Sequence, residues 1–225
     1  MKKFSFLVIT LLLLLMTLYN PTDELFLSFK LLTQGSALDV YTMEKFLIPY
    51  NFMFNLGLSI LFIAPICSRI SEIFELRNYL ITRGGEAVFK KVLIKKAFAV
   101  IVRVLLAKLL LYGVVFLIEQ SATWFILYDL VSTLLTLGMF AIVFILCKLN
   151  GASDKMPLFL LISGNMIAQI LSFEIRATSI IVIASIHWED APFGVITIKA
   201  LILLLLIFLV YFRKNANQIL EVENQ

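Results

Sequence analysis

The sequence predicts an all-α, polytopic membrane protein with six transmembrane helices. Of its 225 residues 61% are hydrophobic, and the mean hydropathy is +1.01, whereas soluble domains are about 45–50% apolar. The apolar residues gather in six stretches, each near the ~20 residues that a helix needs to cross a ~30 Å hydrocarbon core. The six expected spans cover residues 4–19, 47–67, 97–118, 124–147, 157–173 and 194–212.

Lysine and arginine concentrate in alternate connections between these stretches. Because Lys and Arg resist translocation, the connections that are rich in them are expected in the cytosol. This rule places both termini in the cytosol, and it makes residues 1–225 a single transmembrane domain with a cytosolic segment at 68–96. The basic residues expected inside are Lys2, Lys3, Arg69, Arg77, Arg83, Lys90, Lys91, Lys95, Lys96, Lys148, Lys155, Arg213 and Lys214, against Lys30, Lys45 and Arg176 outside.

The first apolar stretch also has features of a secretory signal peptide, because Met1-Lys2-Lys3 precedes it. Its exit, Thr17-Leu18-Tyr19-Asn20, lacks the small-x-small pattern that a signal peptidase needs. We therefore expect a retained first span. Cleavage would leave five spans and put the termini on opposite sides of the membrane.

The stretch 157–186 is too long for one ordinary span, and Glu174 and Arg176 interrupt it. We predict a fifth span ending near Phe173, followed by a short apolar element at about 174–186 that dips back on the external side. Irregular backbone is tolerated at membrane depth only where protein or water satisfies it. This element is therefore expected to pack against other spans.

Two polar stripes run along the expected second and fifth spans, each with helical spacing, so each projects from one helical face. The stripes lie at matching depth. They either line a common cavity or subunit seam, or they join helices by hydrogen bonds worth about 0.6 kcal/mol each. The stripes are Asn51, Asn55 and Ser59 at i, i+4, i+8, and Asn165, Gln169 and Ser172 at i, i+4, i+7.

Charged residues inside spans are costly, and they are usually paired or functional. Lys108 lies deep in the third span, and Asp129 enters the fourth span from the other side of the short connection 119–123. At 1.5 Å rise per residue their levels differ by roughly 7 Å, which a lysine side chain nearly bridges. We predict an intramembrane Lys108–Asp129 ion pair. Lys199 is expected to snorkel outward.

Several kinds of chemistry find no support in the sequence. There is no Gly-x-x-x-x-Gly-Lys-Ser/Thr phosphate loop, so the chain is not expected to hydrolyse ATP through that device. His187 is the single histidine, and it stands beside Trp188, Glu189 and Asp190 in an expected external turn. Such a turn is more often solvated than metal-bound. We expect no metal or cofactor in this chain and no nucleic-acid partner.

The cytosolic segment 68–96 is where a protein partner would bind. Its basic second half suits anionic lipid headgroups, which would hold the flanking spans in place. The acidic and aromatic residues of the stretch 71–80 instead suit a protein contact. We expect a helix to about Thr82, a turn at Gly84-Gly85 and then a basic helix that continues into the third span.

In topology and in this segment the chain resembles the membrane subunits of bacterial ATP-binding-cassette exporters of the ABC type-2 class. The stretch Glu75-Leu76-Arg77-Asn78-Tyr79-Leu80-Ile81-Thr82-Arg83-Gly84-Gly85 is similar to that family's coupling helix, leucine-rich turn and small-residue bend. Where the family has a proline-containing turn, this chain has Thr82-Arg83-Gly84-Gly85. The residues that the resemblance implies for partner docking are Glu72, Glu75, Arg77, Tyr79, Arg83, Gly84 and Gly85.

The resemblance implies a permease in a bacterial cytoplasmic membrane, not an enzyme. It would form a homodimer or heterodimer and be driven by a separate ATPase subunit that binds ATP and Mg. In the family the second and fifth spans line the route of the cargo, which here would be an antimicrobial or signalling peptide, a lipid or a drug. Two alternatives stay open: a non-catalytic immunity, sensor or assembly factor, and an intramembrane enzyme using Glu174, His187 and Glu189.

Overall fold

A computed structural model describes residues 47–119, 124–171, 175–183 and 192–212. Within these ranges the chain forms five α-helices and one short 3-10 helix, with no strand. The expected first span, 4–19, lies outside the described residues. The elements are α3 (Leu47–Glu75), α4 (Arg77–Glu119), α5 (Trp124–Leu149), α6 (Lys155–Leu171), η2 (Arg176–Ile181) and α7 (Pro192–Phe212).

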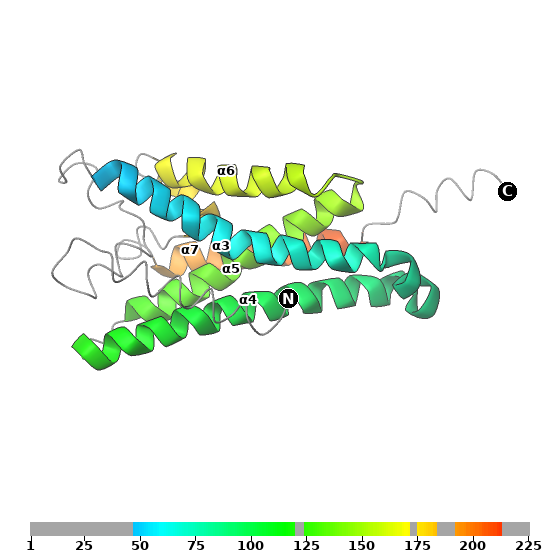
Figure 1. The fold of residues 1–225 in the computed structure, drawn as a ribbon, viewed down its shortest axis with the longest axis horizontal. Coiled ribbons are helices and arrows are strands. Elements are labelled where there is room, and N and C mark those ends of the chain that lie inside the picture. The colour runs from blue at the N-terminus through cyan, green and yellow to red at the C-terminus, as the bar shows by residue number, and fades with distance from the viewer. Residues whose placement is uncertain (1–46, 120–123, 172–174, 184–191, 213–225) are drawn as a thin grey trace.

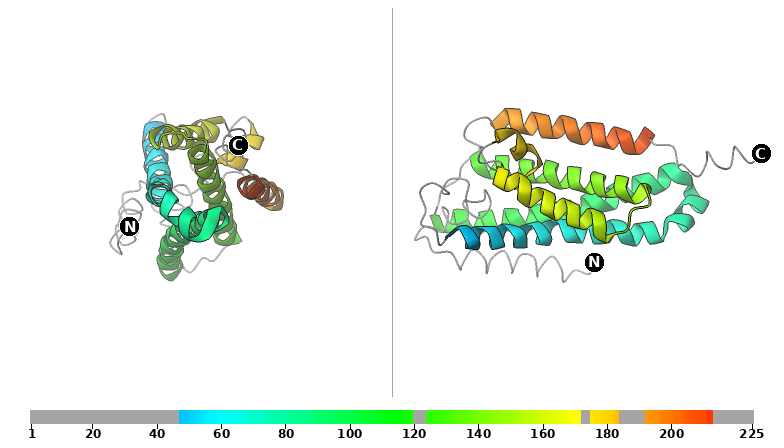
Figure 2. Two further views of the ribbon diagram at one scale, coloured as in Figure 1. Left: turned by 90° about the vertical axis from the view of Figure 1, so that its right-hand side faces the viewer. Right: turned by 90° about the horizontal axis from the view of Figure 1, so that it is seen from above.

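The helices run up and down in one elongated bundle (Figure 1). Helix α5 is its centre, because it contacts α3, α4, α6 and α7. The α3–α4 and α5–α6 connections lie at the same end of the bundle, and η2 lies at the other end (Figures 1 and 2). The α3–α4 hairpin extends beyond the ends of the other helices in Figure 1 and in the right view of Figure 2.

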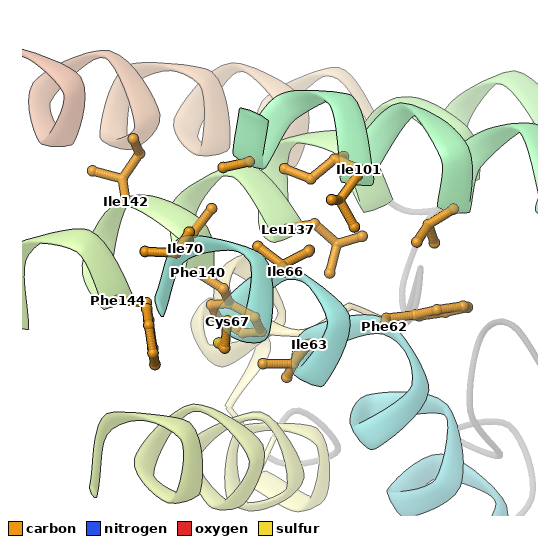
Figure 3. Packing of buried hydrophobic residues seen from close by; sticks show 14 of the residues in the cluster. Phe62, Ile63, Ile66, Cys67, Ile70, Ile101, Leu137, Phe140, Ile142 and Phe144 are labelled. Carbon is orange, nitrogen blue, oxygen red and sulfur yellow. The ribbon is translucent and has the colours of Figure 1, made fainter. Parts of the chain in front are cut away.

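The core lies where α3, α4 and α5 meet, and apolar residues at helical spacing build it. On α3 these are Phe62, Ile66 and Ile70, each no more than 2% exposed. They belong to one buried cluster with Leu137 of α5 and Ile101 of α4 (Figure 3). A stripe repeating every third or fourth residue puts these side chains on one face of each helix, so burial of that face holds the three helices together.

The α3–α4 hairpin contains two breaks in its helical backbone. Helix α3 ends at Glu75, where the Leu76 N–H bonds to the Ile73 carbonyl at 3.1 Å in a tightened last turn. Within α4, Gly85 has φ 74° and ψ 172°, and the helix then continues to Glu119. The bend at Gly85 lies where the sequence predicts a turn, whereas the break at Leu76 interrupts the helix expected to reach Thr82.

The 3-10 helix η2 follows α6 and packs against both α6 and α7. The two residues after it, Val182 and Ile183, are buried. The interrupted element expected at 174–186 therefore contains a 3-10 turn packed against other helices, as far as residues 175–183 describe it. Glu174 and residues 184–186 lie outside the described residues.

Two stretches of the described helices, Ile126–Leu149 and Phe193–Phe212, are long and apolar enough to cross a membrane. Helix α7 is apolar around nearly its whole circumference, and most of it is exposed on the surface of the bundle. A helix of this kind is typical of an apolar environment. The count of six spans and the cytosolic position of both termini remain predictions.

We predict that Gly85→Ala lowers the thermal stability of the purified protein in mild detergent. The Gly85 backbone occupies a region that is essentially restricted to glycine, so a side chain there costs about 1–3 kcal/mol. A Cβ at this position meets nothing within 4 Å, which makes the effect one of backbone alone. Gly113→Ala is the matched control, because Gly113 is helical and equally open. Gly113→Ala should leave the melting temperature unchanged or raise it. Equal melting temperatures of the two variants would show that a side chain at position 85 causes no backbone strain.

Candidate functional site

The tip of the α3–α4 hairpin carries most of the residues expected to dock a partner. Glu75, Tyr79 and Arg83 are exposed there, and the Arg83 guanidinium lies 4.5 Å from the centroid of the Tyr79 ring. Arg77 is half-buried. Glu72 is set back along α3, where its carboxylate forms an ion pair with Arg69 on the preceding turn.

Exposed apolar side chains accompany these charges at the tip. Leu76 is 55% and Tyr79 53% exposed, and Val88 is also exposed. Gly84 lies against Val88, whose side chain would be only 2.9 Å from a Cβ on Gly84. A mixture of exposed aromatic, aliphatic and charged groups at a protruding tip is typical of a protein-binding surface.

The base of the hairpin is packed rather than free. The Phe74 and Phe89 rings meet edge to face with centroids 5.4 Å apart. Lys148, at the end of α5, lies 5.7 Å from the Phe74 ring centroid and forms an ion pair with Asp154 in the α5–α6 turn. The hydrogen bond from Lys148 lowers the pKa of the Asp154 carboxyl, to which Ser71 also bonds. The hairpin is therefore tied to the α5–α6 connection.

The two predicted polar stripes meet between α3 and α6. The Asn165 Nδ2 atom donates to Ser59 Oγ at 2.7 Å, and both residues are buried. Ser59 in turn contacts the Met166 sulfur at 3.8 Å. Gln169 is buried one turn further along α6.

At Ser59 and Asn165 the stripes form a helix–helix contact within one chain, as the hydrogen-bond interpretation of the sequence expects, whereas the cavity or subunit seam remains a prediction. The side chains of Asn51 and Asn55 on α3, and the whole of Ser172, lie outside the described residues.

Lys108 and Asp129 lie together inside the bundle. The Lys108 Nζ atom is 2.5 Å from Asp129 Oδ2, and both side chains are at most 4% exposed. Lys108 also donates to Thr133 Oγ1 at 2.9 Å. The Tyr112 hydroxyl, one turn along α4, donates to Asp129 Oδ2 at 2.8 Å. The carboxylate is therefore held by two groups of α4, which compensates part of the cost of burying it.

Lys199 does not snorkel, contrary to the expectation from the sequence. It is 1% exposed, and its Nζ atom donates to Ser132 Oγ at 2.7 Å, Thr136 Oγ1 at 2.9 Å and the Val182 carbonyl at 3.1 Å. Three acceptors match the three donors of an ammonium group. Because the side chain points toward α5 and η2, the end of this lysine stays inside the protein.

These polar side chains satisfy the backbone that follows η2. The Val182 carbonyl accepts from Lys199 and also from Thr136 Oγ1 at 3.2 Å. The next amide, Ile183 N–H, donates to Asn165 Oδ1 at 2.9 Å. A non-helical segment buried in an apolar bundle needs such partners, because each unsatisfied group would cost several kcal/mol. Helices α5, α6 and α7 each supply one hydrogen-bond partner for this segment.

A third polar stripe, which was not predicted from the sequence, lies on α5. Asp129, Ser132, Thr133 and Thr136 follow the spacing i, i+3, i+4, i+7, so they share one helical face. All four are fully buried. The spacing alone would have revealed this stripe, whereas its partners on α4 and α7 required the packing of the helices.

The remaining candidate residues of the sequence, Glu174, His187, Glu189 and the cation cluster around His187, lie outside the described residues. Within the described part of the chain, no three His, Cys, Asp or Glu side chains gather as a metal site would require. The chemistry available in the buried cluster is that of hydrogen bonds and one ion pair.

We predict that Asp129→Asn and Lys108→Met each destabilise the protein by about 3–5 kcal/mol, because each leaves its partner buried without its counter-charge. The double variant should recover a large part of that loss. Thermal unfolding in mild detergent measures all three, with Lys91→Met, an exposed lysine on the same helix, as the control. If the losses of the two single variants simply add in the double variant, the two side chains do not interact.

We predict that Asn165→Leu accelerates hydrogen exchange at the amide of Ile183, because that amide loses its acceptor. Mass spectrometry of the peptide covering residues 175–183 measures the rate. Ser163→Ala is the control, since the Ser163 hydroxyl bonds only to carbonyls of its own helix. Unchanged exchange in Asn165→Leu would mean that the amide has another acceptor.

Comparison of the chain with family models, curated proteins and solved structures found no match. The function must therefore be argued from the arrangement of its own residues.

Proposed function

We propose that this chain is the membrane-embedded permease subunit of an ATP-binding-cassette exporter. It acts as a dimer and is driven by a separate ATPase that docks on the tip of the α3–α4 hairpin. The single observation that carries the proposal is the protruding hairpin with its exposed charged and apolar tip (Figures 1 and 2).

The length of α3 supports an extension into water. Its 29 residues measure about 44 Å at 1.5 Å per residue, whereas the hydrocarbon core is ~30 Å thick. The hairpin end of the bundle also carries the basic residues of α4, with Lys91, Lys95 and Lys96 all exposed. Lysines mark the cytosolic face of a membrane protein, so the tip lies on the side where an ATPase has access to ATP and Mg.

The hairpin has a bent tip and a packed base, so movement of the tip can be passed on to the bundle. Its tip bends at Leu76 and Gly85, while its base is held by the Phe74–Phe89 contact and by Lys148. Below the base, α4 continues as one helix to the buried Lys108 and Tyr112. A partner that moves the tip would act across the bend at Gly85 on the part of α4 that is joined to the centre of the bundle.

The Ser59–Asn165 contact between α3 and α6 is the element that we assign to the cargo route. In this proposal the contact between the two helices, in which Asn165 Nδ2 donates to Ser59 Oγ, closes the route when no cargo is moved. Asn, Ser and Gln side chains show no strong preference for charge, which suits a peptide, a lipid or a drug as cargo. The chain itself performs no covalent chemistry in this proposal.

The test is co-purification of the ATPase. The wild-type protein, extracted in mild detergent from its native host, should retain a protein that carries a Gly-x-x-x-x-Gly-Lys-Ser/Thr loop. Replacing both Leu76 and Tyr79 by Ala should lower the amount retained about ten-fold or more, because central aromatic and aliphatic contacts dominate binding. Phe98→Ala, an equally exposed aromatic further along α4, is the matched control.

We expect the charged residues at the tip to be needed for coupling ATP hydrolysis to transport, but not for insertion of the protein into the membrane. In the same complex, Glu75→Ala combined with Arg77→Ala should leave membrane insertion intact and separate ATP hydrolysis from transport. The absence of any such ATPase in the wild-type sample, or its full retention by the Leu76 and Tyr79 variant, would refute the proposal.

A further inference from the structure

An apolar crevice lies on the side of the bundle between α4 and α7. Both helices pack on α5 but hardly touch each other, and the crevice between them has a volume of about 140 Å³. Ile94 and Phe98 line it on α4, Gly138 and Ala141 form its floor on α5, and Leu203 and Ile207 line it on α7. Phe98, at its edge, is 50% exposed, so the crevice opens to the surroundings of the bundle.

The depth of the crevice follows from the directions of the three helices. Helix α4 runs away from the hairpin end, while α5 and α7 run toward it (Figures 1 and 2). Ile94 and Ile207 therefore lie at the hairpin end of the crevice, and Leu203 lies deeper. The crevice exists because Gly138 and Ala141 of α5 have small side chains or none. Leu203 packs against Gly138, where a Cβ would come within 3.2 Å of its side chain, and the lining continues past this contact to Leu134 and Leu135.

Two exposed lysines stand at the hairpin end of this crevice. Lys91 precedes Ile94 by three residues and Lys95 precedes Phe98 by three, so each lies one turn closer to the hairpin on a neighbouring face of α4. No ion pair within the described part of the chain engages either ammonium group. Lys90, by contrast, is buried and forms an ion pair with Glu86, with 2.7 Å between Nζ and Oε1. The crevice thus has an apolar lining, and two ammonium groups lie on the adjoining exposed face of α4 near its hairpin end.

We infer that this crevice binds one anionic phospholipid of the leaflet at the hairpin end. An acyl chain lies between α4 and α7 on the floor of Gly138 and Ala141, and the headgroup phosphate meets Lys91 and Lys95. Charge complementarity selects the lipid class, because basic groups next to a membrane attract anionic headgroups by about 1 kcal/mol each. The inference rests on the proposed placement of the bundle in a membrane, but not on the ATPase.

Native mass spectrometry of the full-length protein with added dioleoyl phosphatidylglycerol or phosphatidylcholine tests this site. The wild-type protein should retain one phosphatidylglycerol in preference to phosphatidylcholine. Lys91→Gln combined with Lys95→Gln should weaken phosphatidylglycerol binding about ten-fold or more. Ile94→Trp, which fills the crevice and keeps both lysines, should also abolish the preference.

Lys96→Gln is the matched control, because Lys96 is exposed but lies about 140° around the helix from Lys91. It should bind as the wild-type protein does. Equal retention of both lipids by the wild-type protein, or an equal loss in Lys96→Gln, would overturn the site and indicate general lipid adhesion. A lipid-free dimer that Ile94→Trp disrupts would overturn it as well, since a second copy of the chain would then fill the crevice. None of these results depends on whether an ATPase docks on the hairpin.

Discussion

Backbone amides and carbonyls that leave the helical pattern inside an apolar bundle must find partners within the protein, since neither water nor lipid supplies them there. After η2 the chain meets this requirement through Thr136 of α5, Asn165 of α6 and Lys199 of α7. The buried polar residues at this end are therefore needed to fold the segment and to join three helices. Helix α7, which is otherwise largely exposed, depends on Lys199 for its polar attachment to the bundle.

The two ends of the bundle differ in what they offer to their surroundings. At the η2 end, polar groups turn inward and satisfy one another, so this end is closed. At the hairpin end, charged and apolar groups turn outward from bends at Leu76 and Gly85. Helix α4 connects the two, because it carries exposed lysines near the hairpin and the buried Lys108–Asp129 pair further along. The part of α4 that follows the bend at Gly85 thus joins the base of the hairpin to the buried cluster.

Part of the candidate site could be read from residue spacing. Lys108 and Asp129 are the deepest charges of their stretches, and the cost of an unpaired charge in an apolar environment suggests that they meet. The structure places them in contact. Ser59 and Asn165 belong to polar stripes, and they also meet. The assignment of Lys199 was wrong, because a lysine near the end of an apolar stretch can either reach outward or turn inward, and spacing does not distinguish the two.

By itself, the sequence determined that the described chain is helical, where its long helices lie and that it bends at Gly84-Gly85, but not that the helix also breaks at Leu76. Apolar length, helical periodicity and the paired glycines at Gly84-Gly85 are local properties, so they can be read without knowing any neighbour. Only the tertiary structure decided that Lys199 is buried and that the α5 stripe faces α4 and α7, and only it formed the crevice above Gly138. These three features depend on which helices are adjacent and on which backbone groups near η2 lack a helical partner. Neither the helix neighbours nor those backbone groups can be identified from a single stretch of the chain.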